Sequence, residues 1–171
     1  MSDIRAIRVL LIEDNENDAT LIGTMLSESK SPCFELDCVD RLSAAVDRLG
    51  SGVYDVVLSD LRLPDSTCIM TLGEVQKAAG ATPVIILSGY QSEEMAVKLV
   101  KEGAQDYLVK GSFDVNLLVR SILYSIERKK NNRSSNGRHK RNELPQRADP
   151  EMSVVQETLS QSTESQSTES Q

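Results

Sequence analysis

The stretch Asp55-Val56-Val57-Leu58-Ser59-Asp60 is a short apolar run that ends in a carboxylate. A run of Val and Leu this short is typical of a strand that is buried in a parallel sheet. Open α/β folds place their binding sites at the carboxyl ends of such strands. The stretch therefore predicts a parallel sheet with Asp60 at its functional edge.

A second run of the same kind, Val9-Leu10-Leu11-Ile12-Glu13-Asp14, ends in two acids. If the two strands are neighbours, Glu13, Asp14 and Asp60 converge, and three carboxylates repel one another unless a cation or a proton is present. Carboxylate oxygens with retained waters suit Mg²⁺, which is the cofactor we expect. Taken alone, Glu13 and Asp14 would be better explained as charges at a helix N-terminus.

The composition is that of a water-soluble globular protein, with 39% hydrophobic and 26% charged residues in a chain of 171. No run approaches 18 apolar residues, and residues 1–5 lack a signal-peptide pattern, so we expect a cytoplasmic protein without a membrane segment. Cys33, Cys38 and Cys68 form no C-x-x-C pair, and the single histidine is His139. These features favour reduced thiols over a zinc site.

The net charge of −7 is unevenly distributed. Residues 1–127 hold 20 acids and 11 bases, whereas residues 128–171 hold 6 acids and 8 bases. We therefore do not expect nucleic acid as a partner of the folded part. We interpret the basic stretch 128–141 as a solvated helix end and tail, and a patch for nucleic acid or an acidic partner is the weaker alternative.

Five strand-like runs alternate with five stretches of helical periodicity. The strands are predicted at Ile7–Ile12, Phe34–Val39, Val56–Ser59, Val84–Leu87 and Tyr107–Val109. The helices are predicted over about 18–29, 42–49, 69–79, from an N-cap at Ser92 onward, and 115–130. This alternation predicts an α/β fold whose parallel sheet is covered on both faces. Right-handed crossovers leave few topologies, and the flavodoxin-like three-layer sandwich of strand order 2-1-3-4-5 is one of them.

The end of the chain has a different composition. Almost no large apolar residue occurs from Asn131 onward, and residues 161–171 repeat Gln-Ser-Thr-Glu-Ser twice before Gln171. Sequence of this kind cannot bury a core. We therefore predict a folded domain over residues 1–131 and a disordered, polar, low-complexity tail over residues 132–171.

The last two predicted strands also end in polar groups. Ser88-Gly89 follows the fourth strand and Lys110 follows the fifth. A lysine opposite a carboxylate suits a phosphoryl oxygen, and a serine hydroxyl can donate one further hydrogen bond. Together with the acids, this set is suited to placing a phosphoryl group on a carboxylate.

Residues from about 5 to 130 resemble the receiver domain of two-component response regulators. The resemblance rests on five segments: Leu11-Ile12-Glu13-Asp14-Asn15, Asp55-Val56-Val57-Leu58-Ser59-Asp60, Leu63-Pro64-Asp65, Pro83-Val84-Ile85-Ile86-Leu87-Ser88-Gly89 and Gly103-Ala104-Gln105-Asp106-Tyr107-Leu108-Val109-Lys110. It implies a five-stranded parallel sheet of order 2-1-3-4-5 with five helices.

The resemblance also implies a role for each matching residue. Asp60 corresponds to the aspartate that accepts phosphate from a sensor histidine kinase or a histidine phosphotransfer protein. Lys110 corresponds to the invariant lysine, and Ser88 and Tyr107 correspond to the switch residues that move inward on phosphorylation. The implied Mg²⁺ ligands are Glu13, Asp14, Asp60 and the backbone carbonyl of Arg62.

Three positions depart from the common pattern of the family. Gly111 follows Lys110 where many receivers have a cis-proline, which predicts a looser lysine loop. Cys68 stands where a glycine usually allows a backbone turn. Arg62, two residues after Asp60, is hypothesised to change how fast water attacks the phosphoaspartate.

We therefore expect a phospho-accepting receiver in a two-component system or phosphorelay, rather than an enzyme with a separate substrate. Its only chemistry would be self-catalysed phosphotransfer and dephosphorylation. It would signal to a protein through the face of the fourth helix, fifth strand and fifth helix, as a monomer or a phosphorylation-dependent dimer. The alternatives are a phosphorylation-independent scaffold with the same fold and, less favoured, a phosphohydrolase with an aspartyl intermediate.

Overall fold

The computed structural model describes residues 5–89 and 91–136. A five-stranded parallel sheet lies at its centre, in the order β2-β1-β3-β6-β7. Its strands are β1 (Ile7–Ile12), β2 (Phe34–Val39), β3 (Val56–Asp60), β6 (Val84–Ser88) and β7 (Asp106–Val109). Counted along the chain as the five long strands, this is the predicted order 2-1-3-4-5, so the predicted fold is confirmed.

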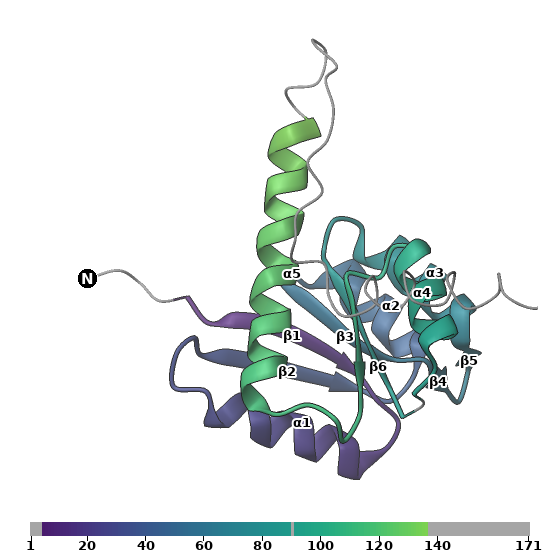
Figure 1. Cartoon of the computed structure of the whole chain (residues 1–171), viewed down its shortest axis with the longest axis horizontal. Helices are drawn as coiled ribbons and strands as arrows, with labels where there is room; N and C mark the ends of the chain where they lie inside the picture. Colours follow the sequence, from purple (N-terminus) through teal and green to yellow (C-terminus); the bar gives the residue numbers. More distant parts are fainter. Residues whose placement is uncertain (1–4, 90, 137–171) are drawn as a thin grey trace, which may run out of the picture. The chain divides into compact units, whose positions relative to one another are not determined.

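Five helices cover the two faces of this sheet (Figure 1). They are α1 (Glu16–Glu28), α2 (Leu42–Ser51), α3 (Cys68–Ala79), α4 (Glu93–Lys101) and α5 (Val115–Asn136). Helices α1 and α5 lie on one face, and α2, α3 and α4 lie on the other. The predicted N-cap at Ser92 is confirmed, because its hydroxyl accepts a hydrogen bond from the N–H of Met95.

Alternating side chains of the strands separate the core into two clusters. In β1, Val9 and Leu11 face the α1–α5 side, whereas Leu10 and Ile12 face the opposite side. The α1–α5 cluster includes Ile22, Leu26, Leu118 and Ile122. The opposite cluster includes Ala45, Leu72, Val75 and Leu99. Strands β3 and β6 are buried along their whole length, which fixes the residues at their carboxyl ends.

The largest differences from the prediction are a hairpin and the end of α5. A short antiparallel hairpin, β4 (Arg62–Leu63) and β5 (Ser66–Thr67), follows β3 directly and was not predicted. Helix α5 continues to Asn136, beyond the predicted end near Lys130, and Figure 1 shows it extending past the sheet. The predicted tail of residues 132–171 lies, from residue 137 onward, outside the described residues.

None of the helices in the described part of the chain is long and apolar enough to cross a membrane.

Candidate functional site

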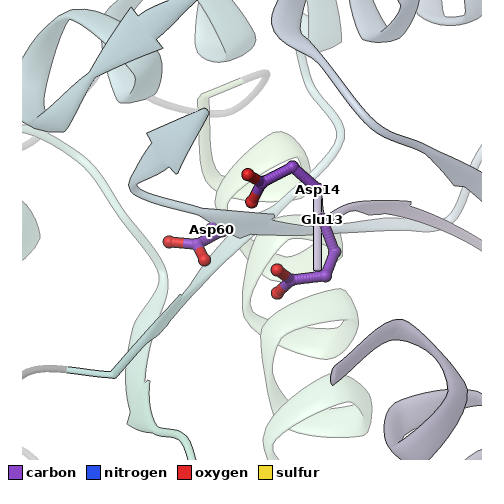
Figure 2. Close-up of side chains that lie close together, drawn as sticks. All are labelled: Glu13, Asp14 and Asp60. Atoms are coloured by element: carbon purple, nitrogen blue, oxygen red, sulfur yellow. The ribbon is translucent and has the colours of Figure 1, made fainter. Parts of the chain in front are cut away.

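Three carboxylates meet at the carboxyl edge of the sheet, as the sequence predicts. Strands β1 and β3 are neighbours, and Ile12 pairs with Ser59, so Glu13 and Asp14 leave β1 beside Asp60. Glu13, Asp14 and Asp60 each offer a carboxylate oxygen, and these oxygens lie within 4.8 Å of one another (Figure 2). Glu13 and Asp60 are buried, whereas Asp14 is exposed.

This donor set fits a small divalent cation. Mg²⁺ prefers carboxylate oxygens and keeps several of its waters. All three carboxylates could hold the ion, and exposed Asp14 leaves one side of the site open to water. A bound cation would also relieve the mutual repulsion of the three carboxylates.

Lys110 is the counter-charge of the cluster. Its Nζ lies 2.5 Å from Glu13 Oε2 and 2.6 Å from Asp60 Oδ2. Although Lys110 follows edge strand β7, only 15% of its side chain is exposed. The structure thus places the predicted lysine and the predicted acceptor carboxylate in direct contact.

Burial and ion pairing have opposite effects on the pKa values of Lys110 and Glu13. Burial lowers the pKa of Lys110, but hydrogen bonds to Asp60, Glu13 and Asp18 outweigh it and raise the pKa above the usual lysine value. Burial also raises the pKa of Glu13, against the hydrogen bond and charge of Lys110. Lys110 therefore remains a cation at neutral pH.

Arg62 lies beside Asp60 through its backbone. The N–H of Arg62 donates a hydrogen bond to Asp60 Oδ1 at 3.0 Å. Arg62 itself is exposed, at the start of the hairpin. The two oxygens of Asp60 thus have different partners, the Arg62 amide on Oδ1 and the Lys110 ammonium on Oδ2.

The two predicted switch residues lie on neighbouring strands. Ser88 is the last residue of β6 and is buried, and its carbonyl accepts a hydrogen bond of 2.8 Å from the N–H of Lys110. Tyr107, in β7, is half-buried and packs against the cluster on the α2–α4 side. Ser88 is one residue beyond Leu87, which pairs with Asp60, so its position places it at the same edge as the carboxylates.

The lysine loop has a defined backbone despite the missing proline. Gly111 has a φ of 80°, a value that proline cannot adopt, because its ring fixes φ near −65°. Hydrogen bonds from the Lys110 and Ser112 amides to Ser88 and Val109 hold the loop on both sides. The change from proline to glycine is therefore matched by a different local conformation.

Cys68, at the first position of α3, adopts the left-handed conformation that favours glycine. Its φ is 51°, and among the described residues it is the only non-glycine residue with a positive φ. The amide of Cys68 donates to the carbonyl of Leu61 at 2.7 Å, which closes the hairpin onto the start of α3. The turn expected at this position thus forms with a side chain present.

Sequence reasoning missed one residue of the site. Asp18, in the first turn of α1, places its Oδ2 3.0 Å from Lys110 Nζ. The available signal was its place in the chain: Asp18 is an acid in the first turn of a helix that begins four residues after the end of β1. Nothing in the local sequence connects it to Lys110, which is 92 residues further along.

Comparison with known proteins identifies the family. The sequence model of the response regulator receiver domain matches residues 9–122. The chain is 32% identical to the regulatory protein AtoC of Escherichia coli over 119 residues, which are 68% of this chain and 25% of AtoC. It is 39% identical to the cell cycle transcriptional regulator CtrA of Caulobacter vibrioides over 104 residues, which are 61% of this chain and 44% of CtrA.

Solved structures agree with this result. A Francisella response regulator receiver domain superposes with a TM-score of 0.63 at 28% identity, and covers 71% of this chain and 98% of its own. The receiver domain of a sensor histidine kinase from Pseudomonas aeruginosa, described with a magnesium ion coordinated in the active site cleft, gives a TM-score of 0.60 at 27% identity. That match covers 72% of this chain and 99% of the other.

The chain belongs to the response regulator receiver domain family, whose general function is phosphorylation-based signalling. Members of this family are regulatory domains rather than classical enzymes. The chain matches less than half the length of the two curated relatives described above.

Proposed function

We propose that Asp60 is the phosphoacceptor of this receiver. The observation that supports this most directly is the contact of 2.6 Å between Asp60 Oδ2 and the Lys110 ammonium, within the cluster of Glu13 and Asp14. A carboxylate at the end of a fully buried strand is fixed in place, and a lysine beside it can neutralise incoming charge.

The transfer requires one bond to form and one to break. An oxygen of the Asp60 carboxylate attacks phosphorus, and the bond from phosphorus to the donor nitrogen of a phosphohistidine breaks. The electron pair of that bond stays on the imidazole nitrogen. Lys110 then neutralises part of the charge on the phosphoryl oxygens, as fixed cations do in phosphoryl transfer.

Mg²⁺ is the proposed cofactor. Glu13, Asp14, Asp60 and the backbone carbonyl of Arg62 would hold it, where it would neutralise charge on the phosphoryl oxygens. The three carboxylates within 4.8 Å support this assignment.

The proposed signal is a change of conformation at Ser88 and Tyr107. Ser88 lies at the carboxylate edge, and Tyr107 lies on the edge strand β7 between α4 and α5 in sequence. Moving both inward would reshape the face of α4, β7 and α5, where a downstream protein would bind. The proposed phosphodonor is a cytoplasmic sensor histidine kinase domain or a histidine phosphotransfer protein.

Phosphorylation by a small donor tests the acceptor. The protein, Asp60→Asn and the control Asp47→Asn, which removes an exposed carboxylate on α2, are incubated with acetyl phosphate and Mg²⁺. Intact-mass spectrometry should show one added phosphoryl group on the wild type and on Asp47→Asn, and none on Asp60→Asn. Absence of the label from the wild type would favour the phosphorylation-independent scaffold, and equal labelling of Asp60→Asn would place the acceptor elsewhere.

A further inference from the structure

Lys110 has a third carboxylate partner, which lies outside the cluster of Glu13, Asp14 and Asp60. The Oδ2 atom of Asp18 is 3.0 Å from Lys110 Nζ, compared with 2.5 Å for Glu13 and 2.6 Å for Asp60. Asp18 and Asp60 accept hydrogen bonds from the ammonium, and Glu13 forms an ion pair with it.

Asp18 is held at the rim of the site by its own helix. Helix α1 begins at Glu16, and the backbone N–H of Asp18 donates to the side chain of its N-cap, Asn15. About one and two turns further on, Ile22 and Leu26 anchor the helix in the core. The Asp18 side chain is 37% exposed, whereas that of Glu13 is fully buried. Asp18 is thus fixed beside Lys110 but on its solvent side.

A divalent cation and the Lys110 ammonium would draw on the same carboxylates. Glu13 and Asp60, which belong to the acidic cluster that would hold a cation, are two of the three carboxylates that Lys110 contacts. Because only 15% of the lysine side chain is exposed, water replaces the lost partners incompletely. An ammonium left there without an anionic partner would oppose binding of the cation.

We propose that Asp18 is a positioning residue that keeps the Lys110 ammonium at the site when a divalent cation takes the oxygens of Glu13 and Asp60. This inference rests on the proposed function, since it concerns the metal-loaded site. The retained ammonium stays beside Asp60, where an incoming phosphoryl group arrives, instead of turning outward to solvent.

Asp18 can affect binding of the cation in two ways. Any nearby negative charge attracts a divalent cation, and this effect is independent of Lys110. The second effect, in which Asp18 accepts a hydrogen bond from the displaced ammonium, requires Lys110. A double-mutant cycle between Asp18 and Lys110 therefore isolates the second effect.

The measured quantity is the dissociation constant of Mg²⁺, from calorimetry or from amide shifts in an NMR titration. The variants are Asp18→Asn, Lys110→Met and the double variant, with Glu16→Gln as a control that removes a charge from the same helical turn. We expect Asp18→Asn to weaken Mg²⁺ binding by about threefold or more, and to do so by less than about twofold in the Lys110→Met background. Asp18→Glu, which restores a carboxylate, should recover most of the affinity.

Equal weakening in both backgrounds would overturn the inference, because Asp18 would then act as a charge alone. So would an unchanged affinity in Asp18→Asn, a Glu16→Gln effect of the same size, or no Mg²⁺ binding by the wild type. The labelling of Asp60 by acetyl phosphate is a separate readout. If the wild type is not labelled, the proposed acceptor is refuted. If labelling is normal but Asp18→Asn weakens Mg²⁺ binding equally with and without Lys110, only the role of Asp18 is refuted.

Discussion

Asp65 caps the helix that begins at Leu42, from a position 23 residues further along the chain. Its Oδ1 accepts the N–H of Leu42 at 2.8 Å, and its Oδ2 accepts the N–H of Ser43 at 2.9 Å. Arg41, the residue before α2, makes no side-chain capping bond. The hairpin that follows Asp60 is thereby tied to the start of α2.

Asp65→Ala should lower the free energy of unfolding by about 1 kcal/mol, the usual cost of losing a cap. The pKa of Asp65 is lowered from its ordinary value of 3.8, first by the hydrogen bond from the Ser43 amide. A lowered pKa means that the stabilisation is present above the ordinary value and is lost as the pH falls through the folded-state pKa. Urea unfolding at several pH values should show the two proteins converging below pH ~4. Asp47→Asn on the same helix serves as the control, and a gap that persists in acid would contradict the cap.

Asp14→Asn should raise the free energy of unfolding by about 0.5 kcal/mol when Mg²⁺ is removed with EDTA. The substitution takes away one of three repelling carboxylates, and the partners of Lys110 are Glu13, Asp18 and Asp60, which remain. Adding Mg²⁺ should stabilise the wild type more than the variant, because a ligand stabilises according to its affinity for the folded state. Urea unfolding with and without Mg²⁺ measures both effects. An identical response to Mg²⁺ would show that Asp14 is not a ligand.

Gly111→Ala should lower the free energy of unfolding by about 1 kcal/mol, since the new side chain would be held at a φ of 80°. Gly111→Pro should cost more and should also reduce labelling of Asp60, because the ring forces the lysine loop into another conformation. Gly73→Ala, in the middle of α3, is the matched control. A Cβ at either glycine meets nothing within 4 Å, so the two substitutions differ only in backbone conformation. Gly73→Ala should stabilise by about 0.5–1 kcal/mol, and the same sign at both sites would contradict the argument.

Cys68→Gly should be more stable than Cys68→Ala by about 1 kcal/mol, because only glycine adopts a positive φ without strain. At an ordinary helical position the order is reversed, and Ala78→Gly in the same helix should lose about 1 kcal/mol. Thermal unfolding of the three variants and the wild type measures this difference. A more stable Cys68→Ala would mean that the left-handed turn carries no strain.

Most of the long strands could be predicted from the sequence because they are short apolar runs, whereas β2 alternates apolar and acidic residues. Residues 7–12 and 34–39 have the predicted bounds, and β3 and β6 each extend by the one polar residue that ends the run, Asp60 and Ser88. The burial of β3 and β6 on both faces makes the pattern clearest in these two strands. The order of the strands then brought Glu13, Asp14 and Asp60 together without further information.

The hairpin could not be predicted, because strands of two residues are too short for any periodicity. The cap by Asp65 was hidden for a related reason: a cap is sought immediately before its helix, and this one follows it in the sequence. The last turns of α5 contain polar residues only, so no apolar pattern marked their extent. The contact of Asp18 with Lys110 depends on how α1 meets the end of β7, which is a property of the assembled fold.

Strand β3 lies at the centre of the sheet, while β7 forms one of its edges. Central strands open only when the whole domain unfolds, whereas edges open locally at a smaller cost in free energy. Asp60 and Lys110 therefore belong to parts of the molecule that open at different rates, although their atoms are 2.6 Å apart. We expect β3 amides to exchange hydrogen far more slowly than those after β7. We therefore expect the lysine to leave and return many times while the carboxylate beside it stays in place.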